Sequence, residues 1–307
     1  MERHCVQLYH YPFTAMASPC ELRLYAASQA LADAAADAAK AEVIRIEQTY
    51  SRYREDSVVG RINAAAGGAP LAVDEETCAL INYATTAYAE SDGLFDISSG
   101  VLREVWNFKL GQLPSPAAVA FCLKRVGWNK VQWDAPNISL QQGMELDFGG
   151  FGKEYAADRA ATICTEQGIA HGLVELGGDI RVIGPHPDGS AWQIGIRNPR
   201  DPDVAMAVIP LKTGGLASSG DYERFMVIDG KRYSHILNPR TGRPVDQPMA
   251  GVTVVAPLCL LAGTAATVAM LQGEKGAPAW LNEMGLPHLW IDQAGVLGGD
   301  LVPKVQS

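Results

Sequence analysis

The sequence predicts a fold that combines helices and strands, and three observations support this. Residues 20–26 (CELRLYA) alternate apolar and polar side chains, as a half-buried strand does. From residue 28 to about residue 50, apolar residues recur every three or four positions, which is typical of a helix with one face in the core. Residues 191–271 contain several short stretches of strand character and then an alanine-rich helical segment. We therefore expect both types of element along the whole chain.

The first half of the chain is predicted to alternate helices with loops. The first helix has Ser28 as a potential cap, and the residues expected to face the core are Leu31, Ala34, Ala38, Ala41, Ile44 and Ile46. A surface loop is expected over 51–74, where charged residues precede a Gly-Gly pair and a proline. The later expected segments are a helix at 75–91, a turn at 91–96 that leads into an extended stretch, a loop at Pro114 and Pro116, and short strands at 130–133 and 138–140.

The second half is predicted to be richer in strands. A glycine-rich turn precedes an expected helix at about 154–167. A strand over 173–183 is broken by Gly177 and Gly178, which indicates a close approach of the backbone to another group. The remaining expected elements are strands at 191–196, 205–211, 225–228 and 252–255 and a helix at 260–271. Since no repeat or long linker is visible, residues 1–307 are expected to form a single domain.

Size and composition are those of a globular protein. The 307 residues are 48% hydrophobic, which is enough to bury a substantial core and excludes disordered and collagen-like chains. Acidic residues outnumber basic ones by 34 to 25, and the formal net charge is -9. A general nucleic-acid-binding surface is therefore not expected, because neutralising phosphates requires clustered Lys and Arg.

Cysteine spacing and hydropathy bear on the compartment. The six cysteines lie far apart with no Cys-x-x-Cys pair, so we interpret them as buried, reduced thiols. The first residues lack the continuous apolar stretch of a secretory signal, and no later run reaches the roughly 20 apolar residues of a membrane span. These observations predict a cytoplasmic protein without a membrane span.

The glycine-rich turn at 146–158 (LDFGGFGKEYAAD) is the first candidate site. Three glycines and Lys153 stand directly before an amphipathic helix. The backbone N–H groups of such a turn, the positive helix end and a lysine suit a phosphate or pyrophosphate. The turn is neither a Walker A loop, which needs Ser or Thr after the Lys, nor a G-x-G-x-x-G fingerprint. A plain strand-to-helix turn with a solvated lysine is the alternative interpretation.

A second candidate site lies between residues 214 and 246, where polar residues are expected in or beside turns. They are Ser218, Ser219, Asp221, Tyr222, His235, Arg240 and Thr241. His235 is a candidate general base or hydrogen-bonding anchor, and a purely structural histidine is the alternative. No G-x-S-x-G nucleophile elbow is present, which argues against a serine hydrolase of that type.

Several sequence blocks, taken in order, resemble one known family. They are AMASP at 15–19, SRYREDS at 51–57, FDI at 95–97, the turn at 147–158, ELGGDI at 175–180, GDY at 220–222, HILNPRTG at 235–242 and the helix at 262–273. Each block is weak alone, but the ordered set, which runs from about residue 12 to residue 273, is specific. On these blocks the chain resembles the ApbE family, the FAD:protein FMN transferases.

The resemblance implies a fold and an activity. The fold is α+β and T-fold-like, with mixed or antiparallel sheets packed against helices. The activity is an enzymatic phosphoryl transfer, in which FMN moves from FAD to a Thr or Ser hydroxyl of an acceptor flavoprotein and AMP is released. FAD is then the substrate and Mg²⁺ the expected cation. A non-catalytic FAD-binding protein and a metal-dependent FAD pyrophosphatase are the alternatives.

The resemblance also implies which residues form the site. The expected FAD-contacting residues are Met16, Tyr53, Leu94, Phe95, Asp96, Asp147, Lys153 and Leu237, the last mainly through its backbone. Lys153 and His235 are the expected catalytic residues, Lys153 at the pyrophosphate and His235 at the acceptor hydroxyl. The Gly150 carbonyl and Thr267 are expected to hold the metal. For Met16, Leu94 and Phe95, ordinary core packing is the alternative.

Three positions depart from the family pattern. Gly263 stands where a metal-binding Asp is usual, Glu154 where Gly often follows the Lys, and Asn238 where Asp is frequent before Pro. The missing carboxylate at position 263 predicts weak cation binding, because Mg²⁺ prefers anionic oxygen ligands. We expect Glu154 to be a solvent-facing charge at a helix start. The alternative is that it supplies the lost negative charge.

Overall fold

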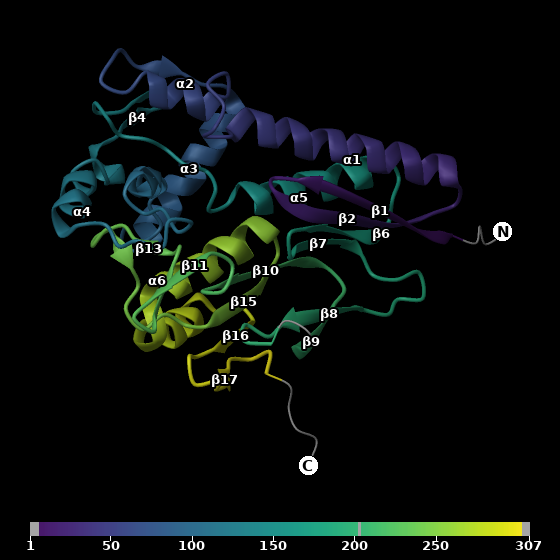
Figure 1. Cartoon of the computed structure of the whole chain (residues 1–307). Coiled ribbons are helices and arrows are strands. Elements are labelled where there is room, and N and C mark those ends of the chain that lie inside the picture. The colour runs from purple at the N-terminus through teal and green to yellow at the C-terminus, as the bar shows by residue number, and fades with distance from the viewer. Residues whose placement is uncertain (1–5, 202–203, 303–307) are drawn as a thin grey trace.

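A computed structural model describes residues 6–201 and 204–302, and its largest feature is an eight-stranded sheet (Figure 1). In the described residues every strand pair is antiparallel, which confirms the predicted α+β class with antiparallel sheets. In spatial order the strands of the large sheet are β1 (Gln7–Ala15), β2 (Ser18–Ala26), β6 (His171–Leu176), β7 (Asp179–Gly184), β10 (Gly214–Gly220), β15 (Gly251–Ala256), β16 (His288–Ile291) and β17 (Leu297–Gly298).

Two tight hairpins form one half of this sheet. β1 and β2 pair along their whole length through a turn at Met16 and Ala17, whose φ angles are 50° and 56°. β6 and β7 are joined at Gly177 and Gly178, with φ angles of 61° and 95°. Positive φ at both central residues is the geometry of a two-residue hairpin turn that matches the twist of the strands. The predicted break at the two glycines is therefore a reversal of the chain, and β1 is a strand that the sequence analysis missed.

Three helices cover one face of the sheet, and a small hairpin covers the other. The helices are α1 (Gln29–Tyr50), α5 (Gly152–Glu166) and α6 (Cys259–Met284), and the hairpin consists of β8 (Trp192–Arg197) and β9 (Ala205–Leu211). Figure 1 shows α1 lying lengthwise along the β1–β2 hairpin, with which it is in contact. Successive strand residues point to opposite faces, so Val174 packs beneath the helices while Leu173 packs against β8 and β9.

α1 begins at the predicted cap but turns a different face to the core. The Ser28 hydroxyl accepts a hydrogen bond from the Leu31 N–H at 3.3 Å. The buried residues of this helix are Ala32, Ala35, Ala36, Ala39, Val43, Ile46 and Tyr50. Among the residues predicted to face the core, only Ile46 is fully buried, and Ile44 is 43% exposed. The small alanine side chains let α1 pack directly against β2 and α5.

α5 and α6 are joined by a single carboxylate. Asp158 on α5 accepts hydrogen bonds from the N–H groups of Cys259 and Leu260, both at 2.9 Å, and so caps the start of α6. Arg181 on β7 lies 3.2 Å from the same carboxylate. α6 continues beyond its predicted end and is kinked at Gly273, where φ is 69°. These contacts fix the first turns of the two helices relative to each other.

The remaining elements lie outside the large sheet, and the first of them contacts α1, beside whose end it is seen (Figure 1). They are α2 (Val58–Ala64), β3 (Leu71–Ala72), α3 (Glu75–Glu90), the 3-10 helix η1 (Ile97–Glu104), α4 (Pro116–Leu123), the 3-10 turn η2 (Trp128–Lys130), β4 (Gln132–Asp134), β5 (Asn137–Ser139), β11 (Phe225–Ile228), β12 (Lys231–Ser234), β13 (Leu237–Asn238) and β14 (Arg243–Pro244). A separate apolar cluster joins η1 and α4 to β11, and it includes Val101, Leu102, Cys122 and Met226.

Some segments predicted as loops contain regular structure. The expected loop at 51–74 includes α2 and β3, because the Ser57 hydroxyl caps α2 by accepting from the Gly60 N–H at 2.8 Å. After the turn at 91–96 the chain enters η1 instead of an extended stretch. Pro116 begins α4, a position that proline tolerates because the first helical N–H needs no partner.

Most of the cysteines are buried free thiols, as predicted. Cys20, Cys122, Cys164 and Cys259 are buried and Cys78 is partly buried. Cys5 was included in the same prediction but lies outside the described residues. In the part of the chain that the structure describes, no helix combines the length and the apolar character needed to cross a bilayer.

Candidate active site

Three turns meet where α5 begins. They are the β1–β2 turn, the β6–β7 turn and the glycine-rich turn that leads into α5. A Cβ on Gly177 would lie 2.8 Å from the Cβ of Ser18 and 3.5 Å from Nζ of Lys153, so both hairpin turns and the lysine are in close contact. The Gly177 N–H also donates to the Pro19 carbonyl at 3.0 Å. Because φ is 61° and no side chain fits, only glycine permits this approach.

Lys153 is held at the start of α5 by a buried carboxylate. Its ammonium lies 2.7 Å from Oδ2 of Asp179, and the exposed fractions of the two side chains are 30% and 5%. Burial alone would lower the pKa of Lys153, but the carboxylates of Asp179 and Glu154 raise it overall. A charged lysine that is partly open to solvent, at the positive end of a helix, suits an anionic ligand. This geometry argues against a freely solvated lysine.

Glu154 is buried, which contradicts the expectation of a solvent-facing charge. Only 8% of it is exposed, because it lies on the side of α5 that packs against α6. A Cβ on Gly263 would lie 2.4 Å from Oε1 of Glu154. Burial, reinforced by the negative charge of Asp179, raises the pKa of Glu154. Oε2 of Glu154 is a buried oxygen without a hydrogen-bond partner in the described residues.

The two predicted metal-binding residues lie close in sequence to Glu154 and Gly263. Gly150 stands four residues before Glu154, and Thr267 lies one turn after Gly263 on the same face of α6. In the turn before α5, the N–H groups of Phe151 and Gly152 both bond to the Phe148 carbonyl, and the Gly150 carbonyl receives no backbone N–H among the described turns and loops.

A carboxylate-rich metal cluster is not part of this arrangement. Among residues 6–201 and 204–302, no group of three or more His, Cys, Asp or Glu side chains is placed to hold a metal ion. The oxygen donors expected at the site are instead of three kinds: a carbonyl at Gly150 just before α5, a carboxyl at Glu154 in the first turn of α5 and a hydroxyl at Thr267 on α6. Such hard oxygen donors suit Mg²⁺, which usually keeps several bonds for water or substrate phosphates.

A second polar group forms around Asp147. Arg52 pairs with Oδ2 of Asp147, while Oδ1 accepts from the Gly149 N–H at 2.9 Å. Arg52 also donates to the Tyr53 hydroxyl at 2.8 Å and lies 4.9 Å from the centre of the Tyr53 ring. Tyr53 is 75% exposed, so much of its ring is accessible. The structure thus connects two predicted FAD-contacting residues, Tyr53 and Asp147, through an arginine that the sequence analysis did not single out.

Leu94, Phe95 and Asp96 are buried. The Phe95 ring packs against Phe151, with ring centres 6.2 Å apart. The Asp96 carboxylate caps η1 by accepting from the Ser98 N–H at 2.8 Å and the Ser98 hydroxyl at 2.6 Å, and burial raises its pKa. These side chains support the loop that faces the glycine-rich turn, since a Cβ on Gly150 would lie 3.7 Å from the Phe95 ring. Their contact with FAD stays a prediction.

Met16 and Leu237 are partly buried. The Met16 N–H donates to Oε1 of Glu47 at 2.8 Å, and this bond holds the β1–β2 turn against α1. Positive φ is uncommon for a residue with a side chain and often marks a ligand-binding turn. Leu237 pairs with Pro244 at the start of β13. Both residues are FAD contacts by prediction only.

His235 has a defined orientation. Its Nδ1 lies 3.1 Å from the Arg224 carbonyl oxygen, which can only accept, so Nδ1 carries the proton and Nε2 the lone pair. Burial, reinforced by the positive charge of Arg224, lowers the pKa of His235. Glu223 lies within electrostatic reach of both His235 and Asp179. A neutral imidazole of this kind is suited to accept a proton near neutral pH.

Other polar residues of the 214–246 segment have structural partners. Ser218 and Ser219, expected in or beside turns, lie within β10 because this segment pairs with β15. The Ser218 hydroxyl lies 2.8 Å from the Thr253 hydroxyl on that strand. Asp221 is almost fully buried and accepts two hydrogen bonds from Arg200, at 2.8 and 2.9 Å. These contacts stabilise the strand and the turn after it.

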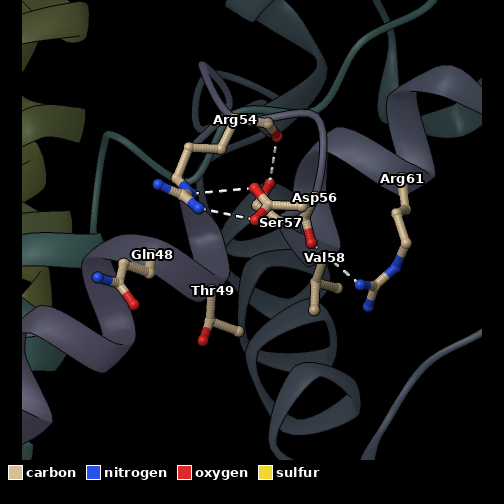
Figure 2. Close-up of a pocket in the computed structure, with 7 residues that line it drawn as sticks. All are labelled: Gln48, Thr49, Arg54, Asp56, Ser57, Val58 and Arg61. Atoms are coloured by element: carbon tan, nitrogen blue, oxygen red, sulfur yellow. Dashed lines mark hydrogen bonds and ion pairs between the residues drawn. The ribbon is translucent and has the colours of Figure 1, made fainter.

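A polar depression near the Arg52 segment has a different character. Figure 2 shows its lining, and its volume is about 310 Å³. Arg54 pairs with Asp56 at 2.7 Å, and Arg61 donates to the Asp56 carbonyl at 3.1 Å. Arg54 and Asp56 are 48% and 71% exposed, and they neutralise each other. Arg61 forms no ion pair among the described residues, so the depression keeps one cation without a carboxylate partner.

Sequence reasoning missed three charged residues at or beside the site. Asp179 directly follows the Gly177–Gly178 turn, and a carboxylate in that position is a signal that could have been used. Arg52 directly precedes Tyr53 and was equally visible. Glu47 gave no signal, because its bond to Met16 depends on how α1 packs on the β1–β2 hairpin.

Comparisons with known proteins support one family. The sequence model of the ApbE family matches residues 16–290. The chain is 31% identical to an FAD:protein FMN transferase of Salmonella typhimurium over 255 residues, which is 80% of this chain and 73% of the relative. It is 32% identical to an FAD:protein FMN transferase of Treponema pallidum, over 89% of this chain and 81% of the relative.

Solved structures agree with the sequence relatives. The ApbE protein of Thermotoga maritima matches with a TM-score of 0.87 and 31% identity, over 97% of this chain and 100% of that one. The apo form of the flavinyl transferase ApbE of Pseudomonas stutzeri gives a TM-score of 0.88 and 26% identity, over 99% and 100%. Similarity in both sequence and structure extends over most of the chain. The chain belongs to the ApbE family.

Proposed function

We propose that this protein is an FAD:protein FMN transferase. The hydroxyl oxygen of a Thr or Ser on an acceptor flavoprotein attacks the phosphorus of the FMN half of FAD. The bond between that phosphorus and the bridging oxygen breaks, and AMP leaves with the bridging oxygen. The hydroxyl proton passes to a base, and FMN is left on the acceptor as a phosphoester. Family membership and the names of the relatives support this reaction.

The ion pair of Lys153 and Asp179 is the observation that carries the proposal. Phosphoryl transfer has little covalent chemistry for the protein to perform, so positioning and charge stabilisation account for most of the acceleration. Asp179 fixes the Lys153 ammonium at 2.7 Å beside the N-terminus of α5. A pyrophosphate bound there would meet a fixed cation, the N–H groups of the glycine-rich turn and the positive end of the helix.

His235 is proposed as the base that activates or orients the acceptor hydroxyl. The Arg224 carbonyl holds the proton on Nδ1, and Nε2 is left to accept. Since burial lowers the pKa of the imidazole, the neutral form predominates at neutral pH. This protonation state is the one that a general base needs before the reaction.

The other predicted residues are proposed to bind the rest of FAD. Tyr53 offers an accessible ring on which a flat ring system can stack, and Asp147 is 23% exposed and can accept a hydrogen bond from the ligand. The further proposed contacts are Met16 in the β1–β2 turn, Leu94, Phe95 and Asp96 just before η1, and Leu237 in β13.

A divalent cation, Mg²⁺, is proposed to take part, with the Gly150 carbonyl, the Thr267 hydroxyl and the phosphates of FAD as ligands. The donor set fits such an ion, because all its members are hard oxygens and a buried carboxyl oxygen near them lacks a partner among the described residues. When bound, Mg²⁺ neutralises charge on the phosphates of the ligand. The protein's own groups position FAD and accept the proton.

One experiment tests the reaction and separates it from its alternatives. Metal-stripped protein is incubated with FAD and an acceptor peptide that carries a Thr, with and without Mg²⁺, and AMP release and peptide mass are followed together. AMP with an FMN-modified peptide is the expected result. AMP with free FMN would instead establish an FAD pyrophosphatase. Bound FAD that stays intact with and without Mg²⁺ would identify a non-catalytic FAD-binding protein.

A further inference from the structure

Glu154 is a buried carboxyl without an evident structural role. It is 8% exposed, and no described residue bonds to its Oε2. The neighbouring ammonium of Lys153 is engaged by Asp179 at 2.7 Å. The neighbouring hydroxyl of Tyr83 donates to Thr264 at 2.7 Å. Burying a carboxyl oxygen without a partner is unfavourable, so a charged ligand is the natural candidate to balance it.

The carboxyl occupies the place that a side chain on Gly263 would fill. A Cβ built on Gly263 would lie 2.4 Å from Oε1, 2.5 Å from Cγ and 2.8 Å from Cδ of Glu154. These distances are far below van der Waals contact. Position 263 must therefore be glycine while Glu154 keeps this orientation, and the two residues share one space between α5 and α6.

Two further oxygen donors belong to the same turns. Thr267 lies one turn after Gly263, and helical side chains lean toward the N-terminus, which directs Thr267 back over the turn that Gly263 begins. The Gly150 carbonyl precedes α5 by two residues and accepts no backbone N–H among the described turns and loops. The Glu154 carboxyl in the first turn of α5, the Gly150 carbonyl just before that turn and the Thr267 hydroxyl on α6 thus belong to the two helices that Asp158 joins and to the turn that leads into α5.

We propose that Glu154 is the anionic ligand of the divalent cation, and that it supplies from α5 the carboxylate that position 263 on α6 lacks. The inference rests on the proposed function, because it assigns a ligand to the cation of that reaction. It changes the expectation of weak cation binding, because the Glu154 carboxylate on α5 occupies the space beside position 263, where α6 has no side chain.

The test is cation binding, measured apart from catalysis. Mn²⁺ replaces Mg²⁺, and free Mn²⁺ is followed by electron paramagnetic resonance during titration of protein saturated with FAD in the absence of acceptor. Glu154→Gln should weaken Mn²⁺ binding by at least about tenfold, the lower end of what disturbed metal sites lose. Glu166→Gln, which removes an exposed carboxylate from the last turn of the same helix, should leave the affinity unchanged.

A second variant keeps the carboxylate and moves it. Gly263→Ala introduces the Cβ that collides with the end of the Glu154 side chain, and a flexible side chain can shift without unfolding the helix. Mn²⁺ affinity should fall in this variant as well. The double variant Glu154→Gly with Gly263→Asp places the carboxylate on α6 and should recover most of the affinity. If the double variant binds Mn²⁺ as weakly as Glu154→Gln does, a carboxylate at 263 cannot replace one at 154, and the two positions do not serve the same cation site.

The outcomes separate this inference from the proposed function. FAD affinity is measured in EDTA by flavin fluorescence for each variant, and it should be unaffected by Glu154→Gln. If wild-type protein binds FAD and Mn²⁺ and transfers FMN, but Glu154→Gln binds Mn²⁺ equally well, the ligand assignment is wrong and the function stands. If wild-type protein binds no FAD, both the ligand assignment and the proposed function are wrong.

Discussion

Replacing Lys153 with Met tests the ion pair at the start of α5. The substitution keeps much of the side-chain volume and removes the charge that neutralises Asp179, which is only 5% exposed. Breaking a buried ion pair typically costs about 3–5 kcal/mol, because it leaves an uncompensated buried charge. Lys153 is 30% exposed, and water screens that side, so we expect the free energy of unfolding to fall by about 3 kcal/mol. Adding Asp179→Asn removes the second charge and should recover most of this loss.

Urea denaturation of wild type, both single variants and the double variant gives the coupling energy directly. Lys40→Met is the matched control, because Lys40 lies 4.0 Å from Asp37 and that carboxylate is 80% exposed. A loss below about 1 kcal/mol for Lys153→Met, comparable with that of an exposed pair, would refute the reasoning. The same variant should bind FAD much more weakly but riboflavin almost normally. If the affinities for FAD and riboflavin fall equally, the assignment of Lys153 to the pyrophosphate is wrong.

Three other substitutions test the turns and the ligand site. Gly177→Ala should lower the free energy of unfolding by about 2 kcal/mol, since φ is 61° and the new Cβ would meet Ser18 at 2.8 Å. Gly178→Ala is the control in thermal unfolding, because φ is also positive at Gly178 but no atom lies within 4 Å of the Cβ it would add. Equal losses of stability in the two variants would refute the contact between Gly177 and Ser18. Tyr53→Ala should change stability by less than about 0.5 kcal/mol but weaken FAD binding by about 1 kcal/mol, and unchanged flavin-fluorescence titrations would exclude stacking. His235→Asn tests a pH dependence of stability. The pKa of the His235 imidazole is lowered in the folded protein, so its stabilising contribution is complete above the unfolded pKa of about 6.5. This contribution is lost as the pH falls from that value toward the lower pKa of the folded protein. Urea denaturation should therefore show that the free energy of unfolding falls more for wild type than for the variant when the pH is lowered from about 7.5 to about 5.5. If the free energies of the two proteins fall in parallel, the lowered pKa of His235 is contradicted.

Elements with a clear period or an evident turn could be predicted from the sequence. The cap at Ser28, the helix at 75–91 and the break at Gly177 and Gly178 depend on neighbouring residues alone, whereas the reversal of the chain at that break was not predicted. Predicting which face of α1 is buried failed, because alanine is compatible with either face and packing against β2 and α5 decides. η1 was missed for a related reason. Its cap, Asp96, also accepts a bond from the Trp128 N–H at 3.0 Å, which is a contact distant in sequence.

In the candidate site too, residues marked by their sequence neighbours could be predicted, and contacts between distant segments could not. Lys153 could be singled out because glycines and a helix start surround it in the sequence. Its partner Asp179 could not be assigned to it, since the pair forms only when the β6–β7 turn lies against α5. The ordered family blocks supplied positions for the FAD contacts, but not the Arg52 link between Tyr53 and Asp147.

Glu154 and Gly263 show why single positions of a family pattern can mislead. In the sequence they are two unrelated departures, one an added charge and the other a lost ligand. In the structure they are one arrangement, because the Glu154 carboxyl fills the space that the missing side chain at 263 leaves. Gly263→Asp alone would therefore place a second carboxylate against the first, within a space where even a Cβ does not fit. Like charges that close repel and disfavour ionisation of both groups, so restoring the usual residue at one position requires removing the substitute at the other.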